Sequence, residues 1–347
     1  MSRKIKWGVL GSGGIAKRRT IPEGISHAEN AELVAVYDIN SEVNQQVAAQ
    51  YNAKAVKSVG ALLKSDIEAV YIATPANLHR KYVIACAKAG KHVLSEKPLG
   101  MKVKEAVKMI DACKGAGVIL GTAFMMRFNT QHRAALQMIK EGRLGKLTYG
   151  RAQLSCWYPP IEGAWRQDPV TGGGGSLMDM GGHCIDLLEM FFGKVKKVSC
   201  FINNTVHNYK SEDSAVVSLF FENGEMATVD TFFCIPDNAS KNVLELYGSL
   251  GGIIAKGTIG QGAAGEMVAF LESGAGGYDA AQARAAAEGI AIAPTPVNTY
   301  KAEIEEFGNA IIENRQPLNS AELGLQSQKV LEACYKSART GKAVNID

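Results

Sequence analysis

The sequence contains no apolar run long enough to cross a membrane. Its 347 residues are 46% hydrophobic, but polar residues interrupt every stretch before it reaches about 18 apolar residues. The first residues lead straight into a predicted strand and lack the apolar core of a signal peptide. We therefore expect a cytoplasmic protein with no membrane partner.

Runs of one charge and paired cysteine motifs are also missing. The net charge is +4 with both signs interspersed, and the longest basic cluster is Lys17-Arg18-Arg19. Nucleic-acid-binding proteins usually carry a basic patch or stripe, so we expect no nucleic-acid partner. The seven cysteines are scattered and include no C-x-x-C. This spacing favours reduced thiols over a disulfide framework or a zinc site, and we expect no metal.

The length and the order of predicted elements favour two domains. In residues 1–124 short apolar strands alternate with helices, which predicts an α/β fold with a doubly wound parallel sheet. In residues 125–347 strands follow one another without crossover helices, which predicts an α+β domain with a mostly antiparallel sheet. Residues 274–296 are rich in Gly and Ala, and we expect an irregular excursion with a short helix near 280–288. The other elements predicted in the second domain are strands at 147–157, 195–207, 215–221, 226–233, 243–247 and 252–255 and closing helices at 303–313 and 321–339.

A glycine-rich turn follows the first predicted strand. Its sequence, Gly11-Ser12-Gly13-Gly14-Ile15-Ala16, has the form G-x-G-x-x-A. The first glycine permits a tight turn, the second lets the backbone approach a pyrophosphate, and the small alanine lets the next helix lie close to the strand. The N-terminus of that helix attracts the pyrophosphate. The alternative is a purely structural turn, but the strand–turn–helix context predicts that Gly11, Ser12, Gly13, Gly14 and Ile15 contact a dinucleotide.

The residue that closes the second predicted strand indicates which dinucleotide binds. Asp38 stands there, and a carboxylate at this position accepts from the ribose 2′-hydroxyl of NAD and repels the 2′-phosphate of NADP. We therefore predict NAD. NADP is the alternative, because the nearby Lys17, Arg18 and Arg19 can offset that repulsion.

Two further turns follow predicted parallel strands, at the sheet edge where ligands bind. One begins at Thr74-Pro75, and the other contains Glu96-Lys97-Pro98, in which the proline biases Lys97 away from helical angles. Taken alone, Lys97 reads as a solvated lysine before a helix, and His79 reads as a residue that caps or packs at a helix start. With the glycine turn, this edge predicts further cofactor contacts at Thr74, Pro75, Asn77, His79, Glu96 and Lys97.

Asp179 and His183 lie four residues apart on a predicted helix, and therefore on one face of it. Metal ligation is one interpretation, with Asp186 or Glu189 as a third ligand, but no second His or Cys lies at ligand spacing. Acid–base chemistry is another, in which a neutral imidazole removes a hydroxyl proton. The third is structural, an Asp near a helix N-terminus and a buried His. The helix alone favours the structural interpretation.

Together these motifs resemble one family. Gly11–Ala16, Thr74-Pro75, Glu96-Lys97-Pro98, Arg127-Phe128-Asn129 and Asp179-x-x-x-His183 are similar to the glucose–fructose oxidoreductase / inositol 2-dehydrogenase / rhizopine-catabolism (Gfo/Idh/MocA) family, from residue 5 to about 345. The resemblance implies a Rossmann domain and a substrate-binding domain whose open sheet builds homodimers or homotetramers. It also implies NAD(P)-dependent hydride transfer at a secondary carbon of a sugar, a polyol such as an inositol, or a glycoside.

The resemblance assigns the catalytic roles to Lys97, Asp179 and His183. We expect His183 to take the hydroxyl proton, Lys97 to stabilise the developing alkoxide, and Asp179 to bind a neighbouring hydroxyl or tune the pair. The rivals are an enzyme that oxidises a glycoside transiently at C3 with NAD and cleaves it by elimination, and a dinucleotide-binding sensor. Arg127 is expected to touch the cofactor as well as the substrate. The full set of expected substrate contacts is Lys97, Arg127, Trp165, Arg166, Asp179 and His183.

Overall fold

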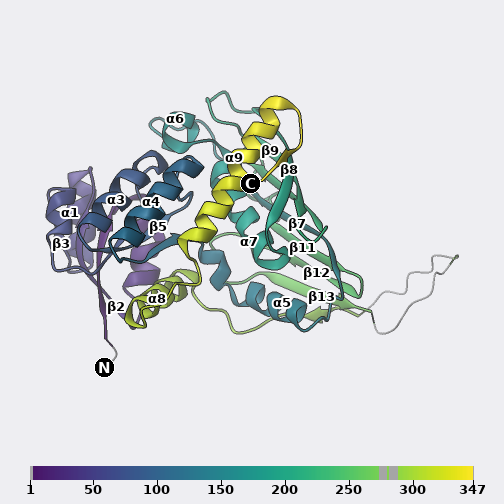
Figure 1. The fold of residues 1–347 in the computed structure, drawn as a ribbon, viewed down its shortest axis with the longest axis horizontal. Coiled ribbons are helices and arrows are strands. Elements are labelled where there is room, and N and C mark those ends of the chain that lie inside the picture. The colour runs from purple at the N-terminus through teal and green to yellow at the C-terminus, as the bar shows by residue number, and fades with distance from the viewer. Residues whose placement is uncertain (1–2, 273–279, 281–287, 347) are drawn as a thin grey trace.

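The computed structural model describes residues 3–272, 280 and 288–346, which form two β-sheets flanked by helices (Figure 1). The chain completes the first sheet before it builds the second. No helix in these residues is both long enough and apolar enough to traverse a bilayer.

The first sheet is parallel throughout and has the order β3-β2-β1-β4-β5-β6. The strand order reverses between β1 and β4, and ligands bind beyond the carboxyl ends of strands at such a point. The predicted doubly wound sheet is confirmed. Its strands are β1 (Ile5–Leu10), β2 (Ala31–Tyr37), β3 (Lys54–Ala55), β4 (Ala69–Ile72), β5 (His92–Glu96) and β6 (Leu120–Ala123).

Both faces of this sheet are covered, which explains why its strands read as continuous apolar runs. Trp7 and Tyr71 lie in the core on one face, and Leu10 and Val70 lie in the core on the other. The helix after the glycine turn is a π-helix that contains Pro22. The helices and turns of this half are η1 (Ala16–Ile25), α1 (Ser41–Gln50), α2 (Val59–Leu63), η2 (Ala76–Leu78), α3 (His79–Lys88) and α4 (Val103–Gly115).

The second sheet has the order β14-β13-β12-β11-β7-β10-β9-β8-β15 and is antiparallel except between β7 and β10. The prediction of a mostly antiparallel sheet is confirmed. Its strands are β7 (Leu147–Ser155), β8 (Val195–Asn203), β9 (Ser214–Phe221), β10 (Met226–Phe232), β11 (Val243–Gly248), β12 (Gly251–Lys256), β13 (Glu266–Leu271), β14 (Ile290–Ala291) and β15 (Val344–Asn345).

Helices lie against one face of this second sheet (Figure 1). Gly150 on β7 shows how close they come, because a Cβ there would lie 2.6 Å from the ring of Phe192. On β9 burial alternates: Val217 is buried, whereas Val216 is 43% and Phe220 38% exposed, so the other face is open. The helices and turns of this half are η3 (Met125–Phe128), α5 (Thr130–Lys140), η4 (Trp165–Gln167), α6 (Pro169–Gly172), η5 (Leu177–Gly181), α7 (Gly182–Phe192) and α9 (Ala321–Thr340).

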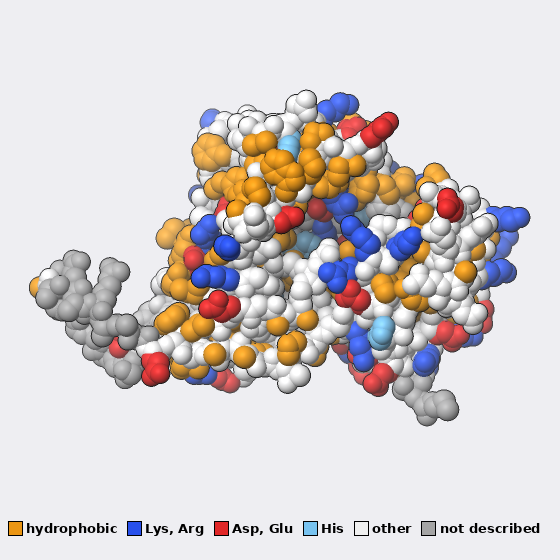
Figure 2. Space-filling model, turned by 180° about the vertical axis from the view of Figure 1, so that it is seen from behind, with side chains coloured by type: hydrophobic (Ala, Val, Ile, Leu, Met, Phe, Trp, Pro, Cys, Tyr) orange, Lys and Arg blue, Asp and Glu red, His pale blue; other side chains and the backbone are white. Residues whose placement is uncertain are grey.

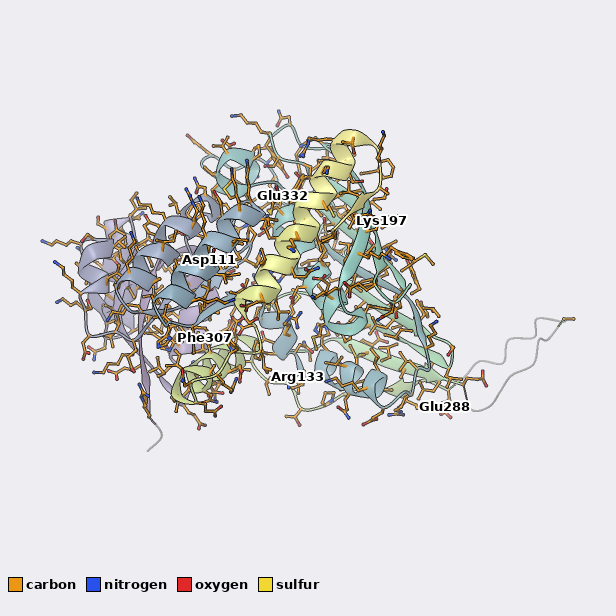
Figure 3. All side chains as sticks on the ribbon, viewed as in Figure 1. Asp111, Arg133, Lys197, Glu288, Phe307 and Glu332 are labelled. Carbon is orange, nitrogen blue, oxygen red and sulfur yellow. The ribbon has the colours of Figure 1, made fainter. Side chains whose placement is uncertain are left out.

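One late helix returns to the first half of the chain. In α8 (Thr299–Ile312), Phe307 packs against Trp7 of β1 with ring centroids 5.6 Å apart, and Figure 3 labels Phe307 in that position. Ile304 is buried in the same core. We keep residues 1–124 and 125–347 as the proposed domains, with α8 as an element that the second contributes to the first.

Several element boundaries differ from those predicted, each for a local reason. The strand predicted at 118–121 is β6 (Leu120–Ala123), because Val118 N–H still closes α4 by donating to Cys113 O. The strand predicted at 195–207 ends at Asn203, since the N–H groups of Thr205, Val206 and His207 all donate to the Asp213 carboxylate.

The region after residue 256 differs most from the prediction. β13 was not predicted, although it pairs with β12 along its whole length. The helix predicted at 303–313 begins at Thr299, because the Asn298 side chain accepts from Tyr300 N–H and Lys301 N–H. Most of the predicted excursion at 274–296, including nearly all of the short helix near 280–288, lies outside the described residues.

Candidate active site

A cavity of about 490 Å³ lies between the two halves of the molecule. Its walls come from the glycine turn, the ends of β4, β5 and β6, the η5–α7 segment and the start of α8. The face shown in Figure 2 is hollowed between the two halves, with basic and acidic side chains around the hollow. Residues far apart in sequence therefore line one cavity that opens to the surface.

The glycine turn has the geometry that a dinucleotide requires. Gly11 has φ +87°, and a Cβ there would lie 2.8 Å from Ala73 O, so only glycine fits. At Gly14, with φ +49°, a Cβ would meet nothing within 4 Å, and Gly14 and Ile15 both line the cavity. The turn thus presents its backbone to open space beside the start of η1, as pyrophosphate binding needs.

Asp38 holds the glycine turn from the end of β2. Its carboxylate accepts from Gly13 N–H at 2.8 Å and from Asn40 N–H at 2.9 Å. The buried hydroxyls of Ser12 and Thr74 have no hydrogen-bond partner among the described residues. These free polar groups and the open backbone fit a bound dinucleotide.

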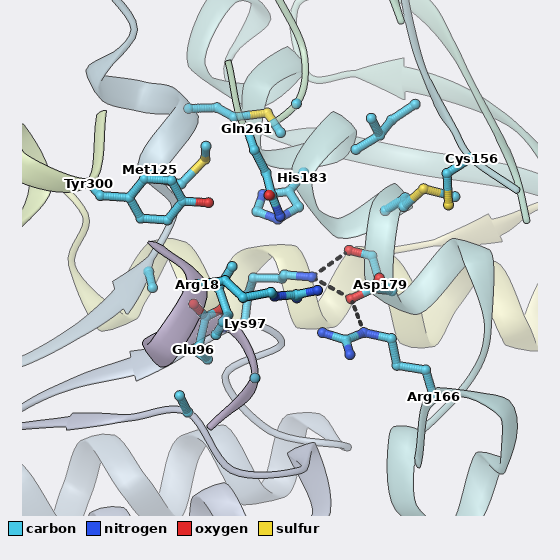
Figure 4. A pocket seen from close by; sticks show the side chains of 18 of the residues that line it. Arg18, Glu96, Lys97, Met125, Cys156, Arg166, Asp179, His183, Gln261 and Tyr300 are labelled. Atoms are coloured by element: carbon cyan, nitrogen blue, oxygen red, sulfur yellow. Dashed lines mark hydrogen bonds and ion pairs between the residues drawn. The ribbon is translucent and has the colours of Figure 1, made fainter. Parts of the chain in front are cut away.

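Of the three basic residues on η1, only Arg18 reaches the cavity. Lys17 Nζ donates to Gln46 Oε1 at 3.2 Å, and Arg19 is paired with Glu23. Figure 4 shows the Arg18 side chain beside Lys97. Two of the three cations that were expected to offset Asp38 are therefore engaged elsewhere.

The turn after β4 brings Thr74 to the cavity, whereas Pro75, Asn77 and His79 lie outside its walls. His79 is 1% exposed, and its two ring nitrogens lie 2.9 Å from Thr74 O and Pro98 O. Burial lowers the pKa of this imidazole. His79 therefore joins the turn after β4 to the turn after β5, and the structure does not place it against the cofactor space.

Lys97 leaves the end of β5 and points into the cavity (Figure 4). Its Nζ donates to Asp179 Oδ1 at 2.6 Å and to Asp179 O at 2.8 Å. Arg166 Nε lies 3.0 Å from the same Oδ1. Burial alone would raise the pKa of Asp179, but the charges of Arg166 and Lys97 outweigh it and hold that pKa well below the usual range.

His183 lines the same cavity without bonding to Asp179 in the described structure. Its Nδ1 is buried and unpaired, and the Phe124 ring lies edge-on at a centroid distance of 6.3 Å. Burial, and then the charge of Lys97, lower the pKa of His183 to about 3, so the ring is neutral. In the described residues no group of three or more His, Cys, Asp or Glu is placed to hold a metal ion.

Glu96 lines the cavity next to Lys97. Its carboxylate accepts from the Tyr71 hydroxyl and from Lys97 N–H, and Thr20 Oγ1 donates to the same Tyr71 oxygen at 2.9 Å. Burial raises the pKa of Glu96, which the Lys97 charge partly offsets. This network holds the backbone from which Lys97 projects.

Trp165 and Arg166 form a wall of the cavity. The Arg166 guanidinium lies over the Trp165 ring at 4.2 Å from its centroid. The loop that carries them is anchored by the buried Gln167, which accepts from Ile161 N–H at 3.0 Å and donates to Pro159 O at 2.7 Å. Both residues, which the sequence predicted as substrate contacts, therefore line the cavity.

Arg127 lies outside the cavity walls. Its Nε donates to both carboxylate oxygens of Asp186, at 2.9 and 2.8 Å, and both side chains are largely buried. The structure therefore gives the arginine a buried carboxylate of α7 as partner, and not the cofactor or substrate space.

Some cavity residues carry no motif in the sequence. Tyr300 stands at the start of α8, and Figure 4 shows its hydroxyl directed into the pocket. The Asn298 cap was the available signal, because it fixes where the helix starts. Arg18 was identified only as a basic neighbour of the glycine turn. The others that the sequence analysis missed include Met125, Cys156, Asp237, Asn242 and Gln261.

Comparison with known proteins relates both halves to one family. Residues 5–124 match the model of an oxidoreductase family with an NAD-binding Rossmann fold, and residues 132–254 match the GFO/IDH/MocA C-terminal domain.

The chain is 30% identical to 1,5-anhydro-D-fructose reductase of Ensifer adhaerens, over 99% of this chain and 98% of that protein. It is 29% identical to D-xylose 1-dehydrogenase (NADP(+)) 2 of Haloferax volcanii, over 98% of this chain and 99% of that one. The structure of aldose-aldose oxidoreductase from Caulobacter crescentus, complexed with glycerol, matches 99% of this chain and all of its own with a TM-score of 0.88 at 25% identity.

Proposed function

Because the chain belongs to the Gfo/Idh/MocA family of oxidoreductases, as its motifs predicted, we propose that Lys97, Asp179 and His183 carry out its chemistry on a sugar or polyol. The observation that supports this proposal is the single cavity that joins these three side chains to Gly14 and Ile15 of the glycine turn. A substrate held there lies between the polar triad and the cofactor space.

Each of the three residues has a distinct task in this proposal. NAD held at Gly14, Ile15 and Asp38 would supply the hydride acceptor for oxidation of the alcohol carbon, and NADH would supply the hydride donor for reduction of the ketone. The neutral His183 accepts the hydroxyl proton. Lys97 donates a hydrogen bond to the same oxygen and stabilises its developing negative charge, and the Lys97 side chain itself is only 10% exposed.

Asp179 holds the Lys97 ammonium in position through hydrogen bonds and an ion pair. Its carboxylate is held ionised by two cations, so it can accept a hydrogen bond from a neighbouring substrate hydroxyl. The Trp165–Arg166 wall offers an aromatic edge and a guanidinium to the rest of the ring. The names of the relatives, a reductase and a dehydrogenase of sugars, favour the same substrate class.

For the cofactor we propose NAD over NADP. Asp38 ends β2 with an ionisable carboxylate, and among the described residues no basic side chain pairs with it. A 2′-phosphate there meets repulsion that a 2′-hydroxyl does not. Replacing Asp38 with Ala should shift the ratio of kcat/KM for NADP over NAD upward about tenfold, while Glu42→Ala, nearby on α1, should leave it unchanged.

The test of the function is absorbance at the reduced-nicotinamide band. The protein is mixed with NAD or NADP and with a panel of sugars, inositols and glycosides. Growth of the band with one polyol is expected. Release of an aglycone from a glycoside without net reduction would instead establish the transient-oxidation alternative, and binding of cofactor with no turnover on any compound would establish a sensor.

We also propose that the open face of the second sheet forms a homodimer or homotetramer interface. Exposed apolar side chains lie on several of its strands, including Phe201 at 75% exposure and Met226 at 55%. Phe201→Lys together with Phe220→Lys should lower the mass measured by light scattering to that of one chain. An unchanged mass would contradict this interface.

A further inference from the structure

A second cavity, of about 720 Å³, lies on the other side of the segment that carries Asp179. Its walls include Gly173, Gly174 and Met178, whereas Asp179, Met180 and His183 line the first cavity. A helix face of α9 and the loop after β8 complete it. The η5 segment therefore separates two cavities.

Buried polar groups without partners stand in the wall of this second cavity. Ser211 is 2% and Gln328 1% exposed. The Ser211 hydroxyl and both amide atoms of Gln328 have no hydrogen-bond partner among the described residues. Buried polar groups are nearly always paired, and leaving one unpaired costs about 1–3 kcal/mol. Ser211 and Gln328 therefore keep unused hydrogen-bonding capacity in the wall of the cavity.

The rim of the cavity carries more basic than acidic side chains, with Glu332 as the exposed acid. Lys102, Lys210 and Arg339 line it, and within the described chain neither Lys102 nor Arg339 takes part in an ion pair. The N-terminus of α4 begins there too, and Glu332, labelled in Figure 3, already accepts from Val103 N–H at 2.9 Å. The Glu332 carboxylate already occupies that helix end, so the excess of cations at the rim, and not the helix N-terminus, favours an anion.

The wall of the cavity also holds the catalytic segment in place. Glu212 accepts from Gly175 N–H at 2.8 Å, from Leu177 N–H at 3.1 Å and from the Tyr335 hydroxyl at 2.8 Å. Glu212 and Tyr335 both line the second cavity. Gln328 also lines a narrow gap whose walls include Lys97. The second cavity is therefore lined by residues that hold the segment leading to Asp179 and by one, Gln328, that lies near Lys97.

We propose that this cavity binds a small hydroxylated anion, in chemical class a sugar acid or a sugar phosphate, and that the ligand changes turnover at the first cavity. The anionic group meets Lys102 and Arg339, and the hydroxyls meet Ser211 and Gln328. Binding of the anion at this site does not depend on the proposed reaction. It can therefore be measured whether or not the protein turns over a sugar.

The experiment is calorimetry of the full-length protein with gluconate, glucose 6-phosphate, inorganic phosphate and glucose as probes. One of the two sugar anions is expected to bind at least tenfold tighter than phosphate or glucose, and which one it is distinguishes a carboxylate from a phosphate ligand. Arg339→Ala should weaken that binding at least tenfold. Arg133→Ala, an exposed arginine on α5 (Figure 3), is the matched control and should leave it unchanged.

A second variant distinguishes binding at the second cavity from binding at the first. Lys97→Met should retain binding of the sugar anion, because Lys97 lines the first cavity and not the second. The same anion should change kcat of the unmodified enzyme at least twofold and leave kcat of Arg339→Ala unaffected. Binding lost in Lys97→Met but kept in Arg339→Ala, equal affinity for phosphate or glucose, or no binding of any probe would each overturn the proposal.

Discussion

Two ion pairs reach the η5–α7 segment, and they differ in their surroundings. Lys97 from the end of β5 pairs with Asp179 of η5, and Arg127 from η3 pairs with Asp186 of α7. The first pair lines the cavity with a third charge, Arg166, at 3.0 Å. The second pair is buried away from the cavity, with Asp186 side-chain exposure of 4%. The same chemistry can therefore serve a reaction in one place and hold helices in place in the other.

The pKa shifts express this difference. Both carboxylates are buried, which raises the pKa of each. At Asp179 two cations reverse the effect, and the pKa is lowered. At Asp186 the single Arg127 offsets burial only in part, and the pKa stays raised. The carboxylate that the proposed mechanism places beside the substrate alcohol thus has two cations, whereas Asp186 has one.

The largest expected effect is on turnover at the first pair. Lys97→Met should lower kcat about 10³-fold, because the developing alkoxide loses its charged hydrogen-bond donor. The affinity for NADH, measured by fluorescence titration, should change less than threefold. Turnover equal to that of the unmodified enzyme would show that Lys97 is as structural as Arg127.

Breaking the Arg127–Asp186 pair should lower the stability of the fold. Arg127→Met leaves the Asp186 charge buried without its partner, and should lower the free energy of unfolding by about 3 kcal/mol in urea titrations. Turnover per folded molecule should stay within about twofold. A fall in kcat of a hundredfold or more with unchanged stability would place Arg127 in the reaction after all.

Glu189, on α7 with Asp186, is a third carboxylate, and hydrogen bonds rather than an ion pair hold it. It accepts from Val195 N–H at 3.1 Å and Gln326 Nε2 at 3.0 Å, and burial raises its pKa to about 7. The folded protein therefore binds a proton here between about pH 4.5 and 7 that the unfolded chain has released, so stability falls as pH rises through that window.

Glu189→Gln keeps both hydrogen bonds and removes the charge. It should stabilise the protein by about 3 kcal/mol near pH 8 and by about 1 kcal/mol near pH 5, measured by urea titration at the two pH values. Glu222→Gln, at an exposed position, is the matched control. A gain that does not depend on pH would contradict the assignment.

The smallest expected effect concerns His183. Since its pKa is about 3, the ring stays neutral, and kcat should show no inflection near pH 6.5, the ordinary value for histidine. The pH–rate profile with saturating cofactor and substrate checks this. An inflection near pH 6.5 that disappears in His183→Gln would show that the ring titrates normally.

The sequence predicted best where function rests on short segments. The glycine turn, Asp38, and the turn at Lys97 each follow a strand directly, so their meeting at one edge follows from a parallel sheet. Asp179 and His183 were predicted to share a helix face, and both line the cavity, although Asp179 lies on the π-helix η5 and His183 on α7, which follows it directly.

The sequence predicted worst where a partner comes from far along the chain. Nothing local shows that Arg127 meets Asp186, 59 residues later, or that the His79 ring lies against Pro98 O. Tyr300 and Asn242 reach the cavity only through the packing of α8 and the second sheet. The strand β13 was also missed, because it forms by pairing with β12. The Gly- and Ala-rich sequence that follows it gives no strand signal.

The most direct test compares the two pairs with both partners replaced. Arg127→Met with Asp186→Leu turns the buried structural pair into apolar contacts, and Lys97→Met with Asp179→Leu does the same in the cavity. We predict that the first double variant keeps kcat within about threefold of the unmodified enzyme. The second should lose about 10³-fold or more although it folds. Equal kcat values for the two double variants would contradict the division between a catalytic pair and a structural one.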